Sequence, residues 1–460
     1  MAVGVISKLY FRQTRSIEAI LMLPTSRAST RQAWRSRRRH ATTRHATTFA
    51  PSGSAGCRCA IVTTVKGVQT SIDAWCSYHL AIGFEHLFLY FDDPQECAEV
   101  DMGSRFTPSS VSAIAHDDIL RAAWRRSLEP HDDCLPHAAQ PGNRVGSGLN
   151  LRQELNARHA MKLACERGLD WLLHIDGDEL FYPGPSGDAA AHFGELSAAG
   201  TSTFCYVNHE AVPESRRVDR PFSELTLFKS NLDAVPRTDE ARAAGGFWTR
   251  RLDSSYFIYY DNGKAAARCD AAVRPLSPHE WLPPQASLDR AFTNMTSPAP
   301  LRHIRHRNRP AAEELARRVR YRACEACILH YPVHCWETLW RRWQRGNLSP
   351  SLWHLFQEQR ARRRQRADGG NAPEEMSGCR SSAGVAAQGS MPLLDGAFTS
   401  RAACEEEAQA ILRHIYEEHV VLEDEAEVRR QVAAGVCRRV LLPKRVLAET
   451  AEAREPRARR

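Results

Sequence analysis

Short apolar runs and helical repeats alternate along the first part of the chain. The run Cys59–Val65 is apolar and rich in β-branched residues, which predicts a strand. Apolar positions in 71–82 recur at helical spacing until Gly83, which predicts a helix. The run His86–Tyr90 predicts a second strand. A strand, a helix and a strand within about 35 residues form a βαβ unit, so the sequence predicts a parallel sheet.

The same alternation of strands and helices continues to about residue 175. Val111–Ala115 predicts a third strand, and the polar, turn-rich residues 127–148 predict a surface loop. Residues Leu149–Arg167 repeat at helical spacing and end at Gly168, which predicts a helix. The next run, Trp171–Ile175, is apolar throughout, as expected of a strand that is covered on both faces.

The patterns after residue 200 are weaker. They predict further strands at Ser202–Val207, Glu224–Lys229, Tyr256–Tyr260 and Ala271–Leu276, and helices at Glu313–Ala326, Cys335–Arg345 and within Ala403–Arg439. Residues 360–395 are charged and then rich in Gly, Ser and Ala, which is typical of disorder. The expected fold is therefore α/β, with a mainly parallel central sheet flanked by helices and a helical C-terminal extension.

Composition divides the chain into three parts. The apolar share of 43% and the charged share of 25% are those of a globular protein. Residues 1–56 contain many arginines and one acid, Glu18, which is typical of a transit segment or a basic disordered leader. We expect one main domain at 57–345 and a mostly helical extension at 346–460. The sequence contains no stretch of about 20 apolar residues, so it predicts no transmembrane span.

The fourteen cysteines are scattered and do not fix a compartment. One cluster has zinc-ligand residue types and consists of Cys324, Cys327, His330 and His334. Only two residues separate Cys327 from His330, which is too short a connection for a zinc finger. The spacing therefore argues against a structural zinc site.

Three carboxylates follow the apolar run Trp171–Ile175, at Asp176, Asp178 and Glu179. In open α/β sheets, ligands bind beyond the carboxyl ends of the strands. Like charges this close raise one another's pKa unless a cation neutralises them, and a hard divalent ion completed by phosphate oxygens fits that need. Gly177 is expected to let the backbone turn so that both aspartates face one point. An isolated Asp-x-Asp is more often a turn, but its place after a buried strand favours the metal interpretation.

Longer strings around this motif resemble a known enzyme family. The strings are Arg152-Gln153, Asn156, His159-Ala160 and Gly168–Phe181, together with Ile61–Lys66, Ile82–His86 and Ile328–Tyr331. They resemble family-2-like and family-92-like glycosyltransferases with the GT-A fold. The likeness spans about residues 57–345, and it is more specific in the first half of that range.

The resemblance implies transfer of a sugar from a nucleotide-diphosphate donor to a glycan, glycoprotein or glycolipid acceptor. Asp176 and Asp178 would hold Mn²⁺ or Mg²⁺ against the diphosphate. Asp92 or Asp93 would bind the ribose or the base, and Lys66 would lie near the nucleotide. Many relatives have Asn-Glu where this chain has Gly67-Val68, so the resemblance does not identify the donor.

Further site residues remain open between alternatives. By the resemblance, a third metal ligand would be His279 or His330. Arg152 could bind phosphate through its guanidinium fork, or it could form a salt bridge. Transfer with inversion needs a carboxylate that deprotonates the acceptor hydroxyl, and Glu210 and Glu214 are the candidates.

Other functions were weighed against the glycosyltransferase. A metal-dependent phosphohydrolase would place Asp-x-Asp on the first strand, and an inactive GT-A homologue would only bind a sugar or a protein partner. The arginines of 302–309 and 360–366 could contact nucleic acid, but the tryptophans nearby have helical spacing and are expected to pack, so no nucleic acid is expected. The resemblance suggests the Golgi or secretory pathway, whereas the leader suggests an organelle.

Overall fold

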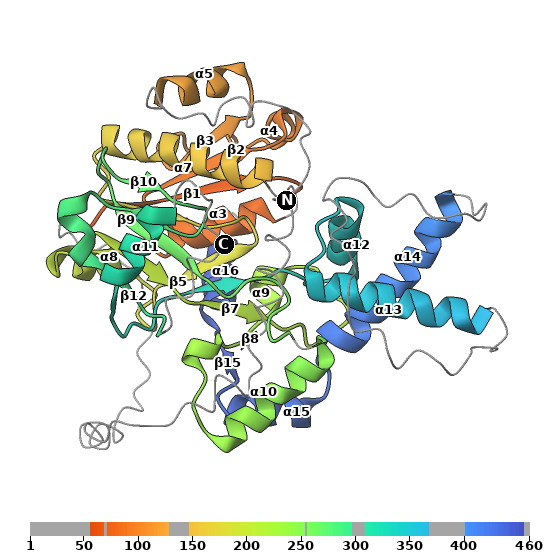
Figure 1. Cartoon of the computed structure of the whole chain (residues 1–460). Helices are drawn as coiled ribbons and strands as arrows, with labels where there is room; N and C mark the ends of the chain where they lie inside the picture. Colours follow the sequence, from red (N-terminus) through yellow and green to blue (C-terminus); the bar gives the residue numbers. More distant parts are fainter. Residues whose placement is uncertain are drawn as a thin grey trace, which may run out of the picture. The chain divides into compact units, whose positions relative to one another are not determined.

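The computed structural model describes residues 56–68, 71–127, 147–253, 255–296, 309–367 and 401–454 (Figure 1). The chain divides into two units, residues 1–56 and residues 57–460, and the description below concerns the second. The predicted leader at 1–56 lies outside the described residues, apart from Gly56. No helix among the described residues is long and apolar enough to cross a membrane.

An eight-stranded sheet forms the centre, in the order β13-β12-β6-β9-β4-β1-β2-β3. Its strands are β1 (Cys59–Val65), β2 (His86–Phe91), β3 (Val111–Ala115), β4 (Trp171–His174), β6 (Thr203–Tyr206), β9 (Lys264–Arg268), β12 (Ala291–Thr293) and β13 (Arg320–Tyr321). β9 runs antiparallel to both of its neighbours, and the other pairs are parallel. The predicted α/β class with a mainly parallel sheet is confirmed.

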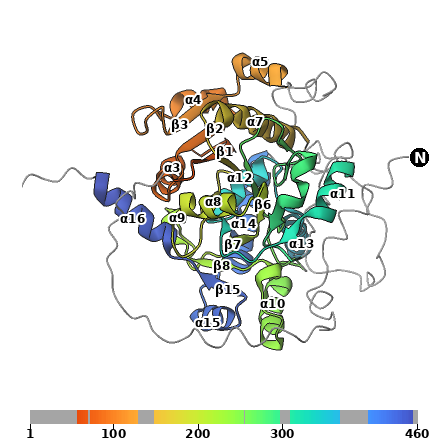
Figure 2. The same ribbon diagram turned by 90° about the vertical axis from the view of Figure 1, so that its left-hand side faces the viewer.

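The first strands are apolar on both faces because helices cover both sides of the sheet. On β1, Ile61 and Val65 pack in one cluster with α3 (Ile72–Ala81) and α8 (Ala189–Ala198). Their neighbours Ala60 and Val62 pack in a second cluster with α5 (Asp118–Ser127) and α7 (Ser147–Glu166). Figures 1 and 2 show α5 and α7 on one side of these strands, with α3 and α8 on the other.

A second sheet of five strands adjoins the first, in the order β15-β8-β7-β14-β5. Its strands are β5 (Glu179–Tyr182), β7 (Asn208–Ala211), β8 (Leu227–Lys229), β14 (Cys327–His330) and β15 (Cys437–Arg439). β4 belongs to the large sheet and β5 to the second sheet. Residues 175–178 connect these two strands, so Asp176 and Asp178 lie where the chain passes from one sheet to the other.

The remaining helices are α4 (Pro94–Glu99), α9 (Pro221–Glu224), α10 (Asp239–Arg251), α11 (Arg309–Arg318), α12 (Trp336–Gln344), α13 (Pro350–Ala367), α14 (Arg401–Ile415), α15 (Glu425–Ala433) and α16 (Leu442–Arg454). Helices α12, α13 and α14 share their own apolar cluster. In the segment predicted as an extension, β15 pairs with β8 and α16 packs against α3 and α9. The predicted boundary at residue 345 therefore does not separate two units.

Most predicted elements before residue 200 are confirmed, and the later ones are confirmed in part. Tyr256–Tyr260, predicted as a strand, is neither strand nor helix. The helix predicted at Glu313–Ala326 ends at Arg318, where the short β13 takes over. Of the stretch predicted as disordered, residues 360–367 belong to α13 and the rest lies outside the described residues, as does most of the predicted loop at 127–148.

Candidate active site

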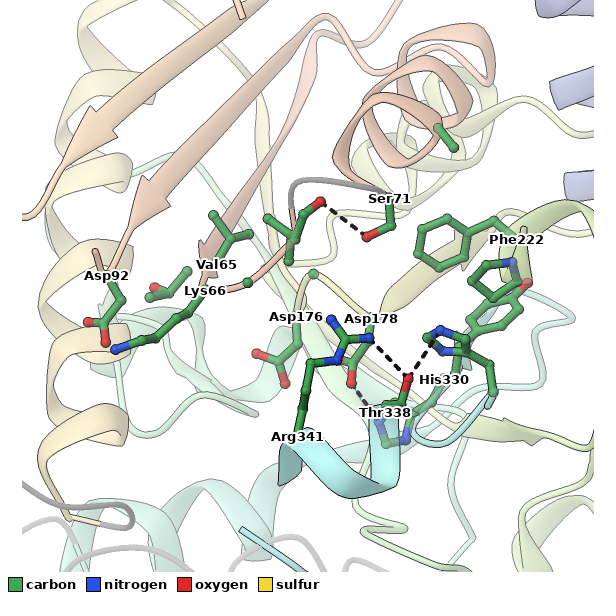
Figure 3. A pocket seen from close by; sticks show the side chains of 18 of the residues that line it. Val65, Lys66, Ser71, Asp92, Asp176, Asp178, Phe222, His330, Thr338 and Arg341 are labelled. Atoms are coloured by element: carbon green, nitrogen blue, oxygen red, sulfur yellow. Dashed lines mark hydrogen bonds and ion pairs between the residues drawn. The ribbon is translucent and has the colours of Figure 1, made fainter. Parts of the chain in front are cut away.

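A cleft of about 1690 Å³ opens at the carboxyl ends of β1, β2, β3 and β4. Residues that follow these strands line it, among them Lys66, Asp92, His116 and Asp176. β9 runs the opposite way, so its first residue, Lys264, lies at the same edge and also lines the cleft. In Figure 3, Asp176 and Asp178 lie between Lys66 and Asp92 on one side and His330 on the other.

Asp92 is held by Arg152 in a two-point ion pair. The Arg152 Nε donates to Oδ1 at 2.5 Å and a terminal nitrogen donates to Oδ2 at 2.8 Å. Of the two roles weighed for Arg152, the structure shows the salt bridge. The carboxylate of Asp93 instead caps α4 by accepting from the Gln95 N–H at 3.0 Å. Of the two neighbouring aspartates, Asp92 is therefore the one that Arg152 of α7 holds at the edge of the sheet.

The Asp176 carboxylate is held on both oxygens. The Gln153 Nε2 donates to Oδ1 at 2.7 Å, and the Lys264 Nζ donates to Oδ2 at 2.6 Å. The backbone N–H of Asp176 donates to Glu179 Oε2 at 2.7 Å, which ties the turn to the first residue of β5. The Lys264 and Glu179 side chains are 1% and 0% exposed, whereas Asp176 remains 26% exposed toward the cleft.

Asp178 is paired with residues from the other end of the domain. A terminal nitrogen of Arg342 on α12 donates to Oδ2 at 2.6 Å, and the His330 Nε2 lies 3.8 Å from the same oxygen. Burial opposes ionisation of Asp178, but His330, Arg342 and Lys264 outweigh burial and hold the pKa of the carboxyl well below its usual range. The side chain is 35% exposed and so remains open to a ligand.

Two protein cations offset the carboxylate cluster. Burial disfavours the charged form of Lys264, but the charges of Asp176 and Glu179 outweigh it and raise the pKa of the lysine. Burial raises the pKa of Glu179 well above its usual value. Lys264 and Arg342 therefore supply, within the protein, part of the positive charge that the carboxylate cluster requires.

Gly177 acts through its size rather than through its backbone angle. It is not among the glycines with a positive φ. A Cβ at this position would lie 3.1 Å from the Val65 Cγ1 and 3.4 Å from the Val68 Cγ1. The missing side chain therefore lets the loop after β1 pack against the aspartate turn.

The two candidate histidines differ in their relation to the aspartates. His330 lies close to Asp178, and its buried Nδ1 has no hydrogen-bond partner among the described residues. The Nδ1 of His279 instead lies 2.7 Å from the Gly263 carbonyl oxygen, and its ring packs against Tyr260. Both line the cleft, and the Nε2 of His330 lies 3.8 Å from an Asp178 carboxylate oxygen.

The side chains around Asp176 and Asp178 include few groups that could bind a divalent ion. Among the described residues, no group of three or more His, Cys, Asp or Glu side chains is arranged to hold a metal. This also holds for Cys324, Cys327, His330 and His334, which all belong to the described residues. Mg²⁺ commonly uses one or two carboxylates and takes its other ligands from phosphates and water. Asp176 and Asp178, which are 26% and 35% exposed, could supply such carboxylates.

The two candidate bases lie away from the cleft. Glu210 is 1% exposed, contacts the Lys229 Nζ at 2.9 Å and accepts from the backbone N–H of Ile258 and Tyr259. Glu214 forms an ion pair with Arg439, in which a terminal nitrogen donates to Oε1 at 2.6 Å. Neither residue lines the cleft. The geometry of these two residues therefore does not support either as the general base.

Several site residues were not found from the sequence. Glu96 on α4 accepts from the N–H groups of Gly67 and Val68, each at 2.7 Å. It therefore holds the backbone of the loop in which this chain has Gly67-Val68 and many relatives have Asn-Glu. Lys264 and Arg342 were also missed. The single lysine before Ala-Ala-Ala in a buried strand was a signal for Lys264. Arg342 had no comparable signal, because arginines are common on α12.

Comparison with known proteins gives an independent indication. No family model matches the chain. Two curated proteins are similar to it, and both are described as glycosyltransferase-like. Glycosyltransferase-like At2g41451 of Arabidopsis thaliana is 29% identical over 227 residues, which is 48% of each chain. Glycosyltransferase-like At3g57200 of the same plant is 27% identical over 226 residues, covering 48% of this chain and 42% of the relative.

The chain thus spans about half the length of the curated relatives it matches. These similarities support a glycosyltransferase. A cleft at the carboxyl ends of parallel strands, with aspartates that face it, is an arrangement in which such an enzyme can bind a nucleotide.

Proposed function

We propose that this protein is a glycosyltransferase of the GT-A type that transfers a sugar from a nucleotide-diphosphate donor to an acceptor hydroxyl. The observation that carries the proposal is the pair Asp176 and Asp178, which face one cleft from the turn between the two sheets. The similarity to glycosyltransferase-like proteins supports the same reaction class.

The nucleotide would lie at the β1–β2 end of the cleft. Asp92 is fixed there by Arg152, so its carboxylate is oriented to accept hydrogen bonds from ribose hydroxyls. Lys66 lines the same end, and Arg341 of α12 and Arg345 just after this helix line the cleft as well. Cationic side chains form charge-assisted hydrogen bonds with phosphate oxygens, so these three residues suit a diphosphate.

A divalent ion, Mn²⁺ or Mg²⁺, would be held by Asp176 and Asp178, with His330 and diphosphate oxygens as further ligands. When bound, it would act as a Lewis acid for the departing nucleoside diphosphate. Lys264 and Gln153 keep Asp176 pointing toward the same space. Arg342 shares Asp178, so this guanidinium also lies within reach of negative charge that develops on the leaving group.

The cleft is larger than the roughly 300–1,000 Å³ of a usual ligand pocket, so it has space for an acceptor next to the donor. Phe222 and the α16 residues Lys444 and Leu447 line it as well. A glycan, glycoprotein or glycolipid acceptor, and transfer with inversion, remain predictions from the resemblance. No base is assigned here, because Glu210 and Glu214 lie elsewhere.

The test is nucleoside diphosphate release from a panel of nucleotide sugars with Mn²⁺, using wild type, Asp178→Asn and the control Asp289→Asn. Asp289 is an exposed acid that pairs with Arg318 and does not line the cleft. We expect release by wild type and the control, and loss in Asp178→Asn. Binding of nucleotide sugars without turnover would instead indicate an inactive homologue, and absence of both would overturn the proposal.

A further inference from the structure

Buried polar side chains lie on one face of the second sheet and just beyond β8, among them Asn208, Glu210, Lys229 and Asn231. Asn208 and Glu210 are two residues apart on β7 and so lie on the same face. Glu210 is paired in register with Lys229 at the end of β8, and Asn231 follows two residues later. Their exposed fractions are 0%, 1%, 1% and 3% for Asn208, Glu210, Lys229 and Asn231. We call these four residues the polar clamp.

The polar clamp binds the backbone of residues 258–263. Glu210 accepts from the N–H of Ile258 at 2.9 Å and of Tyr259 at 3.3 Å. Asn208 donates to the Tyr260 carbonyl oxygen at 2.8 Å and accepts from the Gly263 N–H at 3.1 Å. Asn231 donates to the Asp261 carbonyl oxygen at 2.8 Å. This segment is neither helix nor strand, so the clamp supplies hydrogen bonds that its backbone would otherwise lack.

Lys229 balances the charge of Glu210 inside the protein. Its Nζ lies 2.9 Å from Glu210 and faces three aromatic rings, with centroids at 4.6 Å for Trp248 and 5.4 Å for both Tyr256 and Phe257. Aromatic faces attract a cation, and a buried carboxylate needs one. The ammonium group therefore fixes the Glu210 carboxylate against segment 258–263.

The clamped segment in turn contacts the residues that hold the aspartates. The Tyr259 ring lies 4.5 Å from the Arg342 guanidinium carbon, and the Tyr260 ring lies 5.2 Å from the Lys264 Nζ. The Tyr260 ring also lies 4.6 Å from the His330 ring. Arg342 and His330 contact Asp178, and Lys264 contacts Asp176.

We propose that the polar clamp orients the side chains that hold Asp176 and Asp178 in the cleft. Glu210 is a positioning residue within the clamp. Glu210 acts by binding the backbone N–H groups of Ile258 and Tyr259, which fixes the rings of Tyr259 and Tyr260. These rings contact Arg342 and Lys264, and so orient the two cations toward Asp178 and Asp176. This inference rests on the proposed function, because the aspartates thus oriented would receive the donor diphosphate. It assigns a role to Glu210 other than that of a base.

The first experiment needs no ligand. Amide hydrogen exchange is compared in wild type, Glu210→Gln and the control His86→Leu. His86 is equally buried and its ring nitrogens contact Ser109 and Ser112, but it lies at the amino end of β2, away from the cleft. We expect Glu210→Gln to speed exchange in residues 258–264 and also in the turn 176–179, while the control leaves both at the wild-type rate. Faster exchange in 258–264 alone, or in neither segment, would overturn the inference.

The second experiment separates a positioning residue from a base. Affinities for UDP and GDP with Mn²⁺ are measured by calorimetry, well below the unfolding midpoint of each variant. Glu210→Gln should weaken binding of the nucleotide that wild type binds by about tenfold, which is about 1.4 kcal/mol, and His86→Leu by less than about twofold. Unchanged affinity with transfer that is lost and then restored by added formate would identify Glu210 as a base and overturn the inference. If wild type binds neither nucleotide, the proposed function fails for these donors, and the exchange experiment still decides the role of the clamp.

Discussion

At the scale of single residues, the candidate site depends on two buried or half-buried cations. Lys264 reaches Asp176 from 88 residues away in the chain, and Arg342 reaches Asp178 from 164 residues away. Each cation also faces a tyrosine ring, so aromatic and carboxylate contacts hold the same group. The aspartates are therefore oriented before any ligand binds, which is a general requirement for strong electrostatic stabilisation.

Replacing Lys264 by Met tests this arrangement. The substitution leaves Asp176 and the fully buried Glu179 without their cation, and breaking a buried ion pair costs about 3–5 kcal/mol. We expect the free energy of unfolding in urea to fall by about 3 kcal/mol. The matched control is Lys162→Met, whose exposed pair with Glu166 should contribute less than about 1 kcal/mol. Equal losses in the two variants would contradict the role given to Lys264.

His79 on α3 gives a prediction about pH. Its Nδ1 contacts the Trp75 carbonyl oxygen at 2.9 Å and its Nε2 accepts from the Phe181 N–H at 3.2 Å, so only the neutral ring satisfies both. Burial lowers its pKa to about 3, whereas the unfolded chain has the ordinary value of about 6.5. Between these values the unfolded state binds more protons, so stability falls as pH falls below about 6.5.

The slope that His79 adds is about 1.4 kcal/mol per pH unit within that window. His79→Gln should lower stability at pH 7 but make the decline from pH 6 to pH 4 shallower by about that amount. Urea unfolding at several pH values measures both effects. A variant with the wild-type slope would show that His79 does not titrate on unfolding.

At the scale of elements, the strands whose ends form the cleft were predicted, whereas two strands that support it, β7 and β9, were not. β1, β2 and β4 were found because helices cover both of their faces and their apolar runs are continuous. β7 and β9 were missed because Asn208, Glu210 and Lys264 interrupt the apolar pattern. Each of these polar residues binds a partner that only the folded chain supplies, so local patterning could not reveal them.

The candidate site, too, could be predicted only where its residues are adjacent in the sequence. Asp176 and Asp178 were predictable because strand, turn and carboxylates are adjacent in the sequence. The residues that hold them are not, and one sequence contains no information on which distant lysine or arginine will meet them. Glu210 was noticed as a carboxylate after a strand, but its contacts with segment 258–263 depend on the pairing of β7 with β8.

A substitution at Gly263 tests how closely segment 258–263 packs against β6. Its φ is +68°, and an added Cβ would lie 2.0 Å from the Tyr206 carbonyl oxygen. Gly200 has nearly the same φ, +69°, but has open space around it. Gly200→Ala should therefore cost only the backbone strain of about 1–2 kcal/mol, and Gly263→Ala at least about 2 kcal/mol more. Thermal unfolding of both variants measures the difference, and equal midpoints would mean that the segment moves away at little cost.

At the scale of the whole molecule, residues after 345 complete the core that the first strands begin. Val440, Leu442 and Val446 pack in the same apolar cluster as Ile61 of β1, and α16 also lines the cleft. β15 covers the edge of β8 in the second sheet. A chain of residues 57–345 would expose this apolar surface and leave the β8 edge unpaired, which promotes aggregation.

We therefore expect residues 57–345 alone to be insoluble or to unfold without a cooperative transition, whereas residues 57–454 should unfold cooperatively. Circular dichroism during heating and size-exclusion chromatography measure these outcomes. A milder comparison uses the longer chain with Leu442→Asp, which places a charge in the cluster and should lower the unfolding midpoint, and with Lys444→Asp, which changes charge at a residue outside that cluster. If residues 57–345 folded cooperatively and Leu442→Asp matched Lys444→Asp, the C-terminal segment would be a separate module, and the clamp of the second sheet would have to be stable without β15.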